Sequence, residues 1–286
     1  MNAKRGPRVA IVGAGVMAEA MIAGLLADNA VVARNLVASH PRRERREALG
    51  RQHGIRMVAR NADAVPDAEI VVLAVKPQMV RGVMQEIGPK LADRQVVLSI
   101  VAGVTLHALT TGMGHAAVVR AMPNTPAQIR RGITVWAASS ACTRAQKGLA
   151  RSVLRAIGSE KEVADQTFVA MATALSGTGP TYLFAVMEAL IDAGVHMGFP
   201  RELAHDLVVE TLIGSAEYAS ASGLHPAQLR NLVTSPGGTS AAAIYELEKG
   251  RLRTVLSDAV WAAYRRTLEL GARLEDEVGG ERSPAT

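Results

Sequence analysis

The fold of this chain is decided by residues 8–21, RVAIVGAGVMAEAM. A short apolar run ends in Gly13-x-Gly15-x-x-Ala18, and apolar residues then recur at the spacing of a helix. This order predicts a strand, a glycine turn and a helix. Such a turn holds a dinucleotide pyrophosphate, because glycines let the backbone approach closely and the helix N-terminus attracts negative charge. The cofactor-binding candidates here are Val12, Gly13, Ala14, Gly15, Val16 and Met17.

Strand and helix patterns continue to alternate downstream. Strands are expected at 8–12, 36–38, 70–75, 95–100 and 118–122, with 133–137 and 162–163 as further strands, and a helix at 42–49. After about Asp165 the strand pattern ends, and helices are expected at about 180–194 and from Arg201, His225, Ser240 and Thr254 onward. The chain therefore predicts an α/β fold: an N-terminal Rossmann-type doubly wound sheet in residues 1–164, followed by an all-α C-terminal domain in residues 165–286.

Composition narrows the classes of function. The chain has 286 residues, a net charge of +6, 3% aromatic residues and one cysteine, Cys142. Aromatic residues are missing from its main basic cluster, which argues against nucleic-acid binding. A single cysteine favours a reducing, cytoplasmic location, and no segment matches a membrane span or signal peptide. No metal site is expected, because His196, His205 and His225 have no partners at metal-ligand spacing.

The end of the second strand bears on the choice of cofactor. An NAD-binding chain would carry Asp or Glu there, but this chain has Ser39-His40-Pro41-Arg42-Arg43. A hydroxyl and two guanidinium groups suit a 2′-phosphate, which favours NADP(H), with NAD(H) also possible. Arg45 and Arg46 are expected on a solvated helix face, and Arg42 suits either role. The remaining cofactor candidates are Asn61, Ala74, Val75, Lys76, Pro77, Val101, Ala102 and Gly103, where Lys76 is expected to contact the cofactor or support structure rather than transfer protons.

A second glycine turn lies in the helical half, at Thr234-Ser235-Pro236-Gly237-Gly238-Thr239-Ser240. Two glycines and the start of a helix make a cradle for an anion. The alternative is an ordinary turn with a serine N-cap. The substrate-binding candidates here are Ser235, Gly237, Gly238, Thr239 and Ser240.

Several segments together resemble the pyrroline-5-carboxylate reductase family. They are Gly13–Gly15, Ala74–Gln78, Ala102–Thr105, Met122–Pro126, Ala174–Pro180, Asp192–Val195 and Thr234–Ser240. The resemblance implies reduction of the cyclic imine Δ1-pyrroline-5-carboxylate to L-proline by NAD(P)H, the last step of proline synthesis. It also implies a dimer formed through the helical domain, a possible ring of dimers, and a substrate site at the dimer interface. Ser240 is the catalytic candidate, with Gln166 and Ser176 as further substrate-binding residues.

The chain departs from the family pattern at four positions. Ser240 stands for Thr and Thr178 for Ser, while Gln166 and Ala170 stand where Glu and Asp are expected. The last two replacements remove carboxylates near the expected substrate pocket.

Other functions stay open. A β-hydroxyacid or phosphogluconate-type dehydrogenase would place a catalytic lysine at the start of the helical domain, but no lysine lies between Gln166 and Tyr218. A reductase of another cyclic imine carboxylate and a non-catalytic NADP-binding regulator are the remaining alternatives.

Overall fold

The computed structural model describes residues 6–279, with the side chains of 278 and 279 left aside. The chain divides into two compact units. The first unit runs to Thr178 and resumes at Ala262, while the second unit is Gly179–Trp261. The division expected at residues 164 and 165 stays a prediction.

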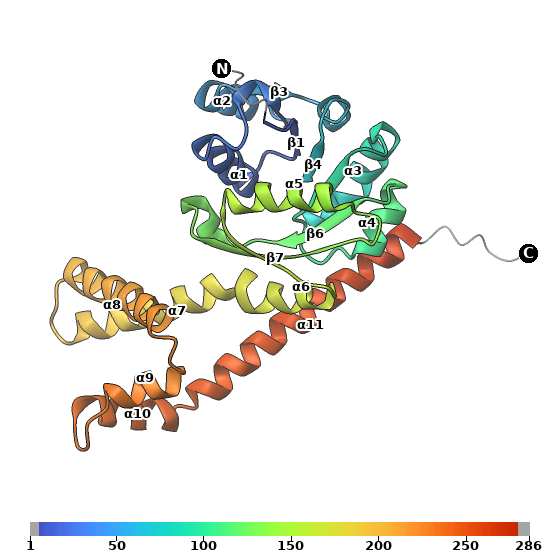
Figure 1. Cartoon of the computed structure of the whole chain (residues 1–286). Helices are drawn as coiled ribbons and strands as arrows, with labels where there is room; N and C mark the ends of the chain where they lie inside the picture. Colours follow the sequence, from blue (N-terminus) through green and yellow to red (C-terminus); the bar gives the residue numbers. More distant parts are fainter. Residues whose placement is uncertain (1–5, 280–286) are drawn as a thin grey trace, which may run out of the picture. The chain divides into compact units, whose positions relative to one another are not determined.

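The first unit is built on one eight-stranded sheet, whose strand order is β3-β2-β1-β4-β5-β6-β7-β8 (Figure 1). The strands are β1 (Val9–Val12), β2 (Leu36–Ser39), β3 (Arg56–Val58), β4 (Ile70–Leu73), β5 (Val96–Ser99), β6 (Val118–Met122), β7 (Gly132–Ala138) and β8 (Gly158–Glu162). Every pairing is parallel except that of β6 with β7. Val12 lies in register with both Ser39 and Leu73, so the carboxyl ends of the central strands share one edge.

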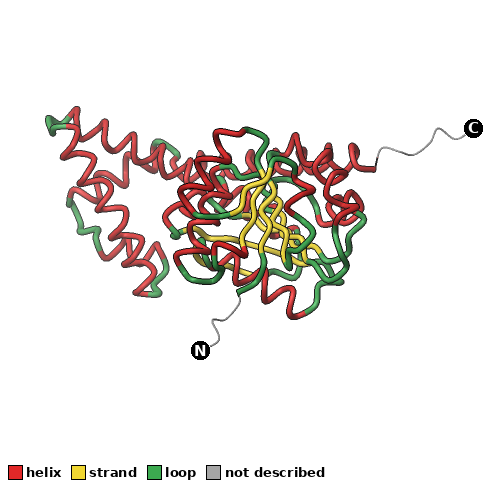
Figure 2. Tube along the Cα trace, turned by 90° about the horizontal axis from the view of Figure 1, so that it is seen from above, coloured by secondary structure: helices red, strands yellow, loops and turns green. Residues whose placement is uncertain are grey.

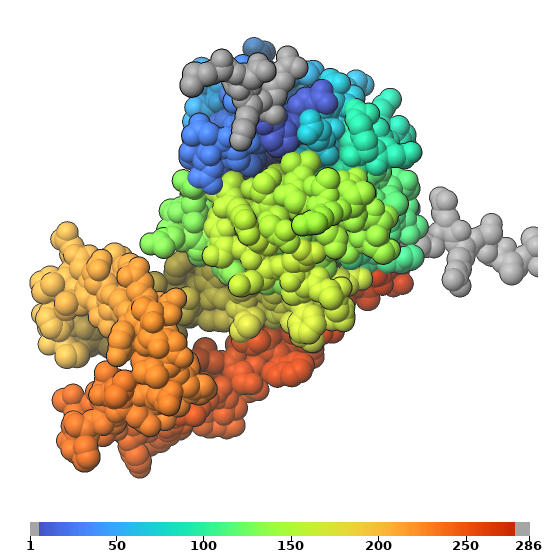
Figure 3. All heavy atoms as spheres, in the orientation of Figure 1, coloured from blue at the N-terminus to red at the C-terminus, as the bar shows by residue number. Residues whose placement is uncertain are grey.

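Helices cover both faces of this sheet, as the view from above shows (Figure 2). Ile11 of β1 belongs to a core with helices α1 and α5, whereas Val12 belongs to a second core with α3 and α4. In the space-filling view, α5 covers one side of the unit in yellow-green (Figure 3). The helices of this unit are α1 (Val16–Ala27), α2 (Arg43–His53), α3 (Val80–Ile87), α4 (Leu106–Met113), α5 (Arg144–Arg155), α6 (Thr167–Ala172) and the later part of α11 (Leu252–Gly279). This arrangement confirms the doubly wound α/β prediction.

A π-helical turn, Thr173–Gly177, follows α6 directly. A Cβ on Gly177 would lie 2.9 Å from Cε of Met122, so the turn packs closely against the end of β6. Single π-helical turns are frequent at functional sites.

The second unit contains only helices among its described residues. They are α7 (Gly179–His196), α8 (Arg201–Ser222), α9 (Pro226–Leu232), α10 (Thr239–Lys249) and the first part of α11. A Cβ on Gly194 of α7 would lie 3.0 Å from the Cβ of Ala204 in α8, so this glycine allows the two helices to approach closely. No described helix of either unit has the length and apolar character needed to cross a membrane.

Candidate active site

A cleft of about 580 Å³ opens in the first unit, where β1, β2 and β4 end. Ligands of doubly wound folds bind at this edge of the sheet. Nine of the predicted cofactor residues line the cleft: Gly13, Gly15, Val16, His40, Arg42, Asn61, Ala74, Val75 and Lys76. The structure adds six residues that the sequence analysis missed: Pro41, Ala59, Arg60, Met79, Val83 and Glu86.

Position 13 requires a glycine, both for its backbone conformation and for the closeness of neighbouring atoms. Its φ is +90°, a backbone angle that residues with a side chain rarely adopt. An added Cβ would also lie 2.5 Å from Cγ1 of Val75 and 3.0 Å from the carbonyl oxygen of Ala74. The backbone of the turn therefore passes directly beside the end of β4.

Gly15 serves the opposite purpose, because it leaves space for a ligand. A Cβ there would meet no atom of the described residues within 4 Å. Gly15 is the N-cap of α1 and supplies no side-chain hydrogen bond, and among residues 6–279 the N–H groups of Val16 and Met17 have no hydrogen-bond partner. These donors and the positive end of the helix dipole suit a pyrophosphate.

A hydrogen-bonded chain of side chains holds the turn in place. Ser39 accepts a hydrogen bond from the N–H of Gly13 (3.2 Å) and donates to Oδ1 of Asn61 (2.8 Å). Asn61 in turn donates to Glu86 (2.7 Å). Ser39 is fully buried. This placement corrects the expectation that its hydroxyl would contact a 2′-phosphate: the hydroxyl is already bonded within the protein and positions the glycine turn instead.

Three basic side chains line one part of the cleft: His40, Arg42 and Arg60. Nδ1 of His40 accepts a hydrogen bond from the backbone N–H of Arg42 (3.2 Å). Burial lowers the pKa of His40 below its ordinary value, and the charges of neighbouring arginines lower it further. Arg60 is paired with Asp63 (2.6 Å).

Two nearby arginines differ from the sequence expectation. Arg45 forms an ion pair with Glu19 (2.6 Å) and lies 3.4 Å from the carbonyl oxygen of Ala14, to which it donates a hydrogen bond. Arg46 donates to the carbonyl oxygens of His40 (2.9 Å) and Pro41 (2.7 Å). Both side chains therefore brace the cleft, and the prediction of a solvated helix face was wrong for them.

The other predicted cofactor residues do not line the cleft: Val12, Ala14, Met17, Ser39, Pro77, Val101, Ala102 and Gly103. Val12, at the end of β1, and Ala14, within the turn, are both buried. Gly103, with a φ of +82°, follows β5 and would meet Leu270 of α11 if it carried a Cβ. These residues support the cleft or border other parts of the unit.

The predicted anion cradle lies wholly in the second unit. Helix α10 begins at Thr239, one residue before the start expected from the sequence, and its N-cap is Gly238. Gly237 has a φ of +72°, which turns the chain into the helix. Among the described residues, the N–H groups of Thr239 and Ser240 have no hydrogen-bond partner. The turn thus presents free backbone donors at a helix N-terminus.

The two remaining substrate candidates belong to the first unit. Ser176 donates a hydrogen bond to the carbonyl oxygen of Ala172 (3.0 Å) within the π-helical turn. Oε1 of Gln166 accepts hydrogen bonds from the N–H of Leu106 (2.8 Å) and from Nη1 of Arg120 (3.1 Å).

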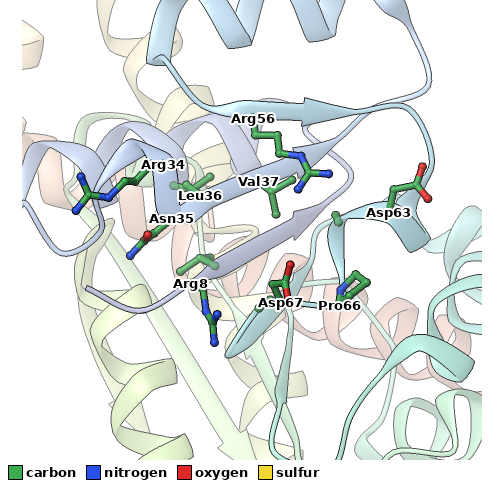
Figure 4. Close-up of a pocket in the computed structure, with 12 residues that line it drawn as sticks. Arg8, Arg34, Asn35, Leu36, Val37, Arg56, Asp63, Pro66 and Asp67 are labelled. Carbon is green, nitrogen blue, oxygen red and sulfur yellow. The ribbon is translucent and has the colours of Figure 1, made fainter. Parts of the chain in front are cut away.

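Another hollow, of about 460 Å³, lies at the opposite, amino-terminal edge of the sheet (Figure 4). Arg8, Arg34 and Arg56 line it, but their guanidinium groups point in different directions and do not converge on one point (Figure 4). The described residues also contain no cluster of His, Cys, Asp and Glu suited to a metal ion. The cleft above β1, β2 and β4 is therefore the best cofactor site.

Comparison with known proteins agrees with this geometry. Residues 166–270 match the family profile described as pyrroline-5-carboxylate reductase dimerisation. A pyrroline-5-carboxylate reductase from Synechocystis is 39% identical over 93% of this chain and 99% of its own length. This chain belongs to the pyrroline-5-carboxylate reductase family. A Pseudomonas aeruginosa member is 40% identical over 94% of this chain and 98% of its own length.

Other comparisons agree with this family assignment. Residues 8–103 match the profile described as NADP oxidoreductase, coenzyme F420-dependent. The structure of the Coxiella burnetii reductase superposes with a TM-score of 0.85 at 34% identity, covering 92% of this chain and 98% of that one. A Plasmodium falciparum pyrroline carboxylate reductase, solved with NADP bound, also gives 0.85, at 29% identity, covering 93% of this chain and 99% of that one. The family and the fold expected from the sequence are thus confirmed.

Proposed function

We propose that this chain is a pyrroline-5-carboxylate reductase, which transfers hydride from NAD(P)H to the C=N bond of Δ1-pyrroline-5-carboxylate and yields L-proline. The observation that carries the proposal is the turn before α10, where the N–H groups of Thr239 and Ser240 have no partner within residues 6–279 and suit a substrate carboxylate. Family members that share 39–40% of their residues with this chain carry that name. The nicotinamide, when bound, supplies the hydride.

The cofactor cleft fits a dinucleotide by its own geometry. A Cβ at Gly13 would clash with Val75 and Ala74, whereas a Cβ at Gly15 would occupy space that is open among the described residues. The first N–H groups of α1 also have no hydrogen-bond partner among residues 6–279. Val12, Ala14, Met17, Ser39, Pro77, Val101, Ala102 and Gly103 stay in the proposal as cofactor-site residues that do not line the cleft.

NADP(H) is the preferred cofactor in this proposal, with NAD(H) also accepted. His40, Arg42 and Arg60 line the part of the cleft that follows β2 and β3, where no Asp or Glu ends β2. A guanidinium group binds a 2′-phosphate with charge-assisted hydrogen bonds. Arg42→Ala should therefore lower kcat/KM for NADPH about tenfold or more, equivalent to roughly 1.5–3 kcal/mol, and leave that for NADH nearly unchanged. Arg43→Ala is the matched control, because Arg43 pairs with Glu47 and does not line the cleft. Higher kcat/KM with NADH in the unaltered protein would refute the preference.

The proposal assigns substrate-binding residues in each unit separately. In the second unit, Ser235, Gly237, Gly238, Thr239 and Ser240 form the carboxylate cradle, and the Ser240 hydroxyl serves as the catalytic group that hydrogen-bonds the ring nitrogen. In the first unit, the proposed substrate-binding groups are Ser176 and the amide nitrogen of Gln166, whose oxygen is already engaged. An iminium substrate can arrive protonated, so these residues mainly bind and orient it.

A homodimer and a cytoplasmic location complete the proposal. The dimerisation profile spans residues 166–270, and large apolar side chains such as Phe184, Leu207 and Trp261 are exposed in the second unit. An apolar surface of this kind suits a second copy of the chain. We extend the proposal to a ring of dimers. We also propose a boundary between residues 164 and 165 that separates a dinucleotide-binding domain from a helical dimerisation and substrate domain.

The decisive experiment follows NADPH oxidation with pyrroline-5-carboxylate. Turnover by the unaltered protein, a strong loss of kcat in Ser240→Ala and full activity in Ser152→Ala, a control on the exposed side of α5, would support the proposal. Turnover only with a different cyclic imine carboxylate would change the substrate. NADPH binding without turnover on any imine would identify a non-catalytic regulator.

A further inference from the structure

A second pocket of the first unit, with a volume of about 240 Å³, lies between β6, α6 and the later part of α11. It shares no lining residue with the cofactor cleft or with the turn before α10. Its polar lining includes Arg120, Gln166, Thr105 and Glu275. Its size suits a ligand smaller than a typical drug.

Arg120 is a buried cation whose charge is not neutralised at close range. The residue is 5% exposed, and its hydrogen bonds with described residues run from Nη1 to the side-chain oxygen (3.1 Å) and backbone oxygen (3.5 Å) of Gln166. No carboxylate of residues 6–279 lies within ion-pair distance of it. Burial lowers the pKa of Arg120, the charge of Glu275 opposes this shift, and a guanidinium stays protonated nonetheless. Buried charges of this kind call for an anionic partner.

Two departures from the family pattern meet at this pocket. Gln166 and Ala170, which stand where Glu and Asp are expected, both line it. Gln166 keeps the hydrogen bonds that a glutamate would make, but it carries no negative charge. Ala170 leaves open the space that an aspartate side chain would fill. Neither residue therefore supplies a negative charge beside the buried arginine.

We propose that this pocket binds a small organic carboxylate, which takes the place of the missing acidic side chains beside Arg120. The planar guanidinium presents paired donors that match the two oxygens of a carboxylate. Glu275 also lines the pocket, held by a hydrogen bond from the Thr105 hydroxyl (2.5 Å), and lies beyond ion-pair distance from Arg120. A ligand that also carries an ammonium group, such as an α-amino acid, would find a partner for each charge.

Binding to the full-length protein tests this proposal without cofactor or imine. Isothermal titration with L-alanine and with propionate compares the same carbon chain with and without the amine. We expect saturable binding of at least one, with alanine tighter if Glu275 holds the amine and equal affinities if the carboxylate alone is recognised. The readout does not use imine reduction, and Ala170 is not among the proposed substrate-binding residues. The Ala170→Asp variant therefore separates failure of this site from failure of the proposed function.

Variants that add a carboxylate inside or outside the pocket test the role of Arg120 more directly. Gln166→Glu supplies an internal carboxylate for Arg120 without changing the size of the side chain, and should weaken binding at least tenfold. Ala170→Asp should do the same while NADPH still binds, which shows that the unit is folded. Gln128→Glu makes the same charge change at an exposed position outside the pocket and should bind as the unaltered protein does. Undiminished binding in Gln166→Glu and Ala170→Asp, or no saturable binding to the unaltered protein at concentrations on the order of 10 mM, would overturn the proposal.

Discussion

Removing the Ser39 hydroxyl tests how the cofactor cleft is organised. Ser39 is fully buried and joins the N–H of Gly13 (3.2 Å) to Oδ1 of Asn61 (2.8 Å). In Ser39→Ala both groups lose their partner. A buried polar group left without a hydrogen bond costs about 1–3 kcal/mol, and Asn61 is only partly buried, so we expect the free energy of unfolding to fall by about 2–4 kcal/mol.

The same variant separates two roles for the hydroxyl. If Ser39 positions the glycine turn, the dissociation constants of NADPH and NADH should rise by the same factor, because both dinucleotides place a pyrophosphate at Gly13 and Gly15. If the hydroxyl contacted a 2′-phosphate, only NADPH would bind more weakly. Urea unfolding measures the stability, and calorimetric titration with each dinucleotide measures the affinities.

Ser152→Ala is the control for this experiment. Ser152 lies on α5 outside the cleft and its exposed hydroxyl donates to the carbonyl oxygen of Leu149 (2.7 Å), so its loss should change stability by no more than about 0.5 kcal/mol. A selective loss of NADPH affinity in Ser39→Ala, or a stability change as small as that of the control, would refute the positioning role.

Three further outcomes are expected. Burial lowers the pKa of His40 below its ordinary 6.5, so this side chain is neutral at pH 7. As the pH falls it gains a proton beside a bound phosphate, so the affinity for NADPH relative to NADH should rise from pH 7 to pH 6. An equal rise in His40→Asn would contradict this role of His40. Gly24→Ala places a Cβ 2.3 Å from the carbonyl oxygen of Ala156, the C-cap of α5, and should destabilise the protein by about 1–3 kcal/mol. Gly82→Ala, whose Cβ would have no atom of the described residues within 4 Å, should instead stabilise it by up to about 1 kcal/mol; thermal unfolding measures both. Gly238→Ala places a Cβ 2.4 Å from Oγ of Ser235, and it should lower kcat/KM for the imine while the affinity for NADPH stays unchanged. Parallel losses of kcat/KM and of NADPH affinity would count against a separate substrate cradle.

The strands of the fold were predictable where burial on both faces leaves an unbroken apolar run. β1, β4 and β5 are buried along their whole length, and the sequence analysis found all three. It missed β3, because Arg56–Val58 has only three residues and none is fully buried. The antiparallel direction of β7 could not be predicted from the alternation of its residues, since side chains alternate in the same way in parallel and antiparallel strands. A connection without a crossover α-helix, formed by residues 123–131, allows β7 to run antiparallel to β6.

Within the cofactor site, prediction succeeded where the chemistry demands one residue type. Only glycine suits the conformation at Gly13 and the ligand approach at Gly15, so both were visible in the sequence. Arg60 and Glu86 were missed for a different reason. Arg60 follows β3, whose carboxyl end reaches the same edge of the sheet, and without that strand nothing in the sequence directs it to the cleft. Glu86 lies in α3 and contributes through its hydrogen bonds to Asn61 and Ala62, which depend on tertiary contacts.

The start of α10 bears on the two interpretations that the sequence left open for the second glycine turn. If a serine capped the helix, its side-chain oxygen would be engaged by a backbone N–H of the first turn. Gly238 holds the cap position instead, and no side chain bonds there. Thr239 and Ser240 consequently lie inside the first helical turn, where neither hydroxyl has a hydrogen-bond partner among the described residues. A helix that leaves both its leading N–H groups and its hydroxyls free is disposed to receive an anion, which favours the cradle over the ordinary capped turn.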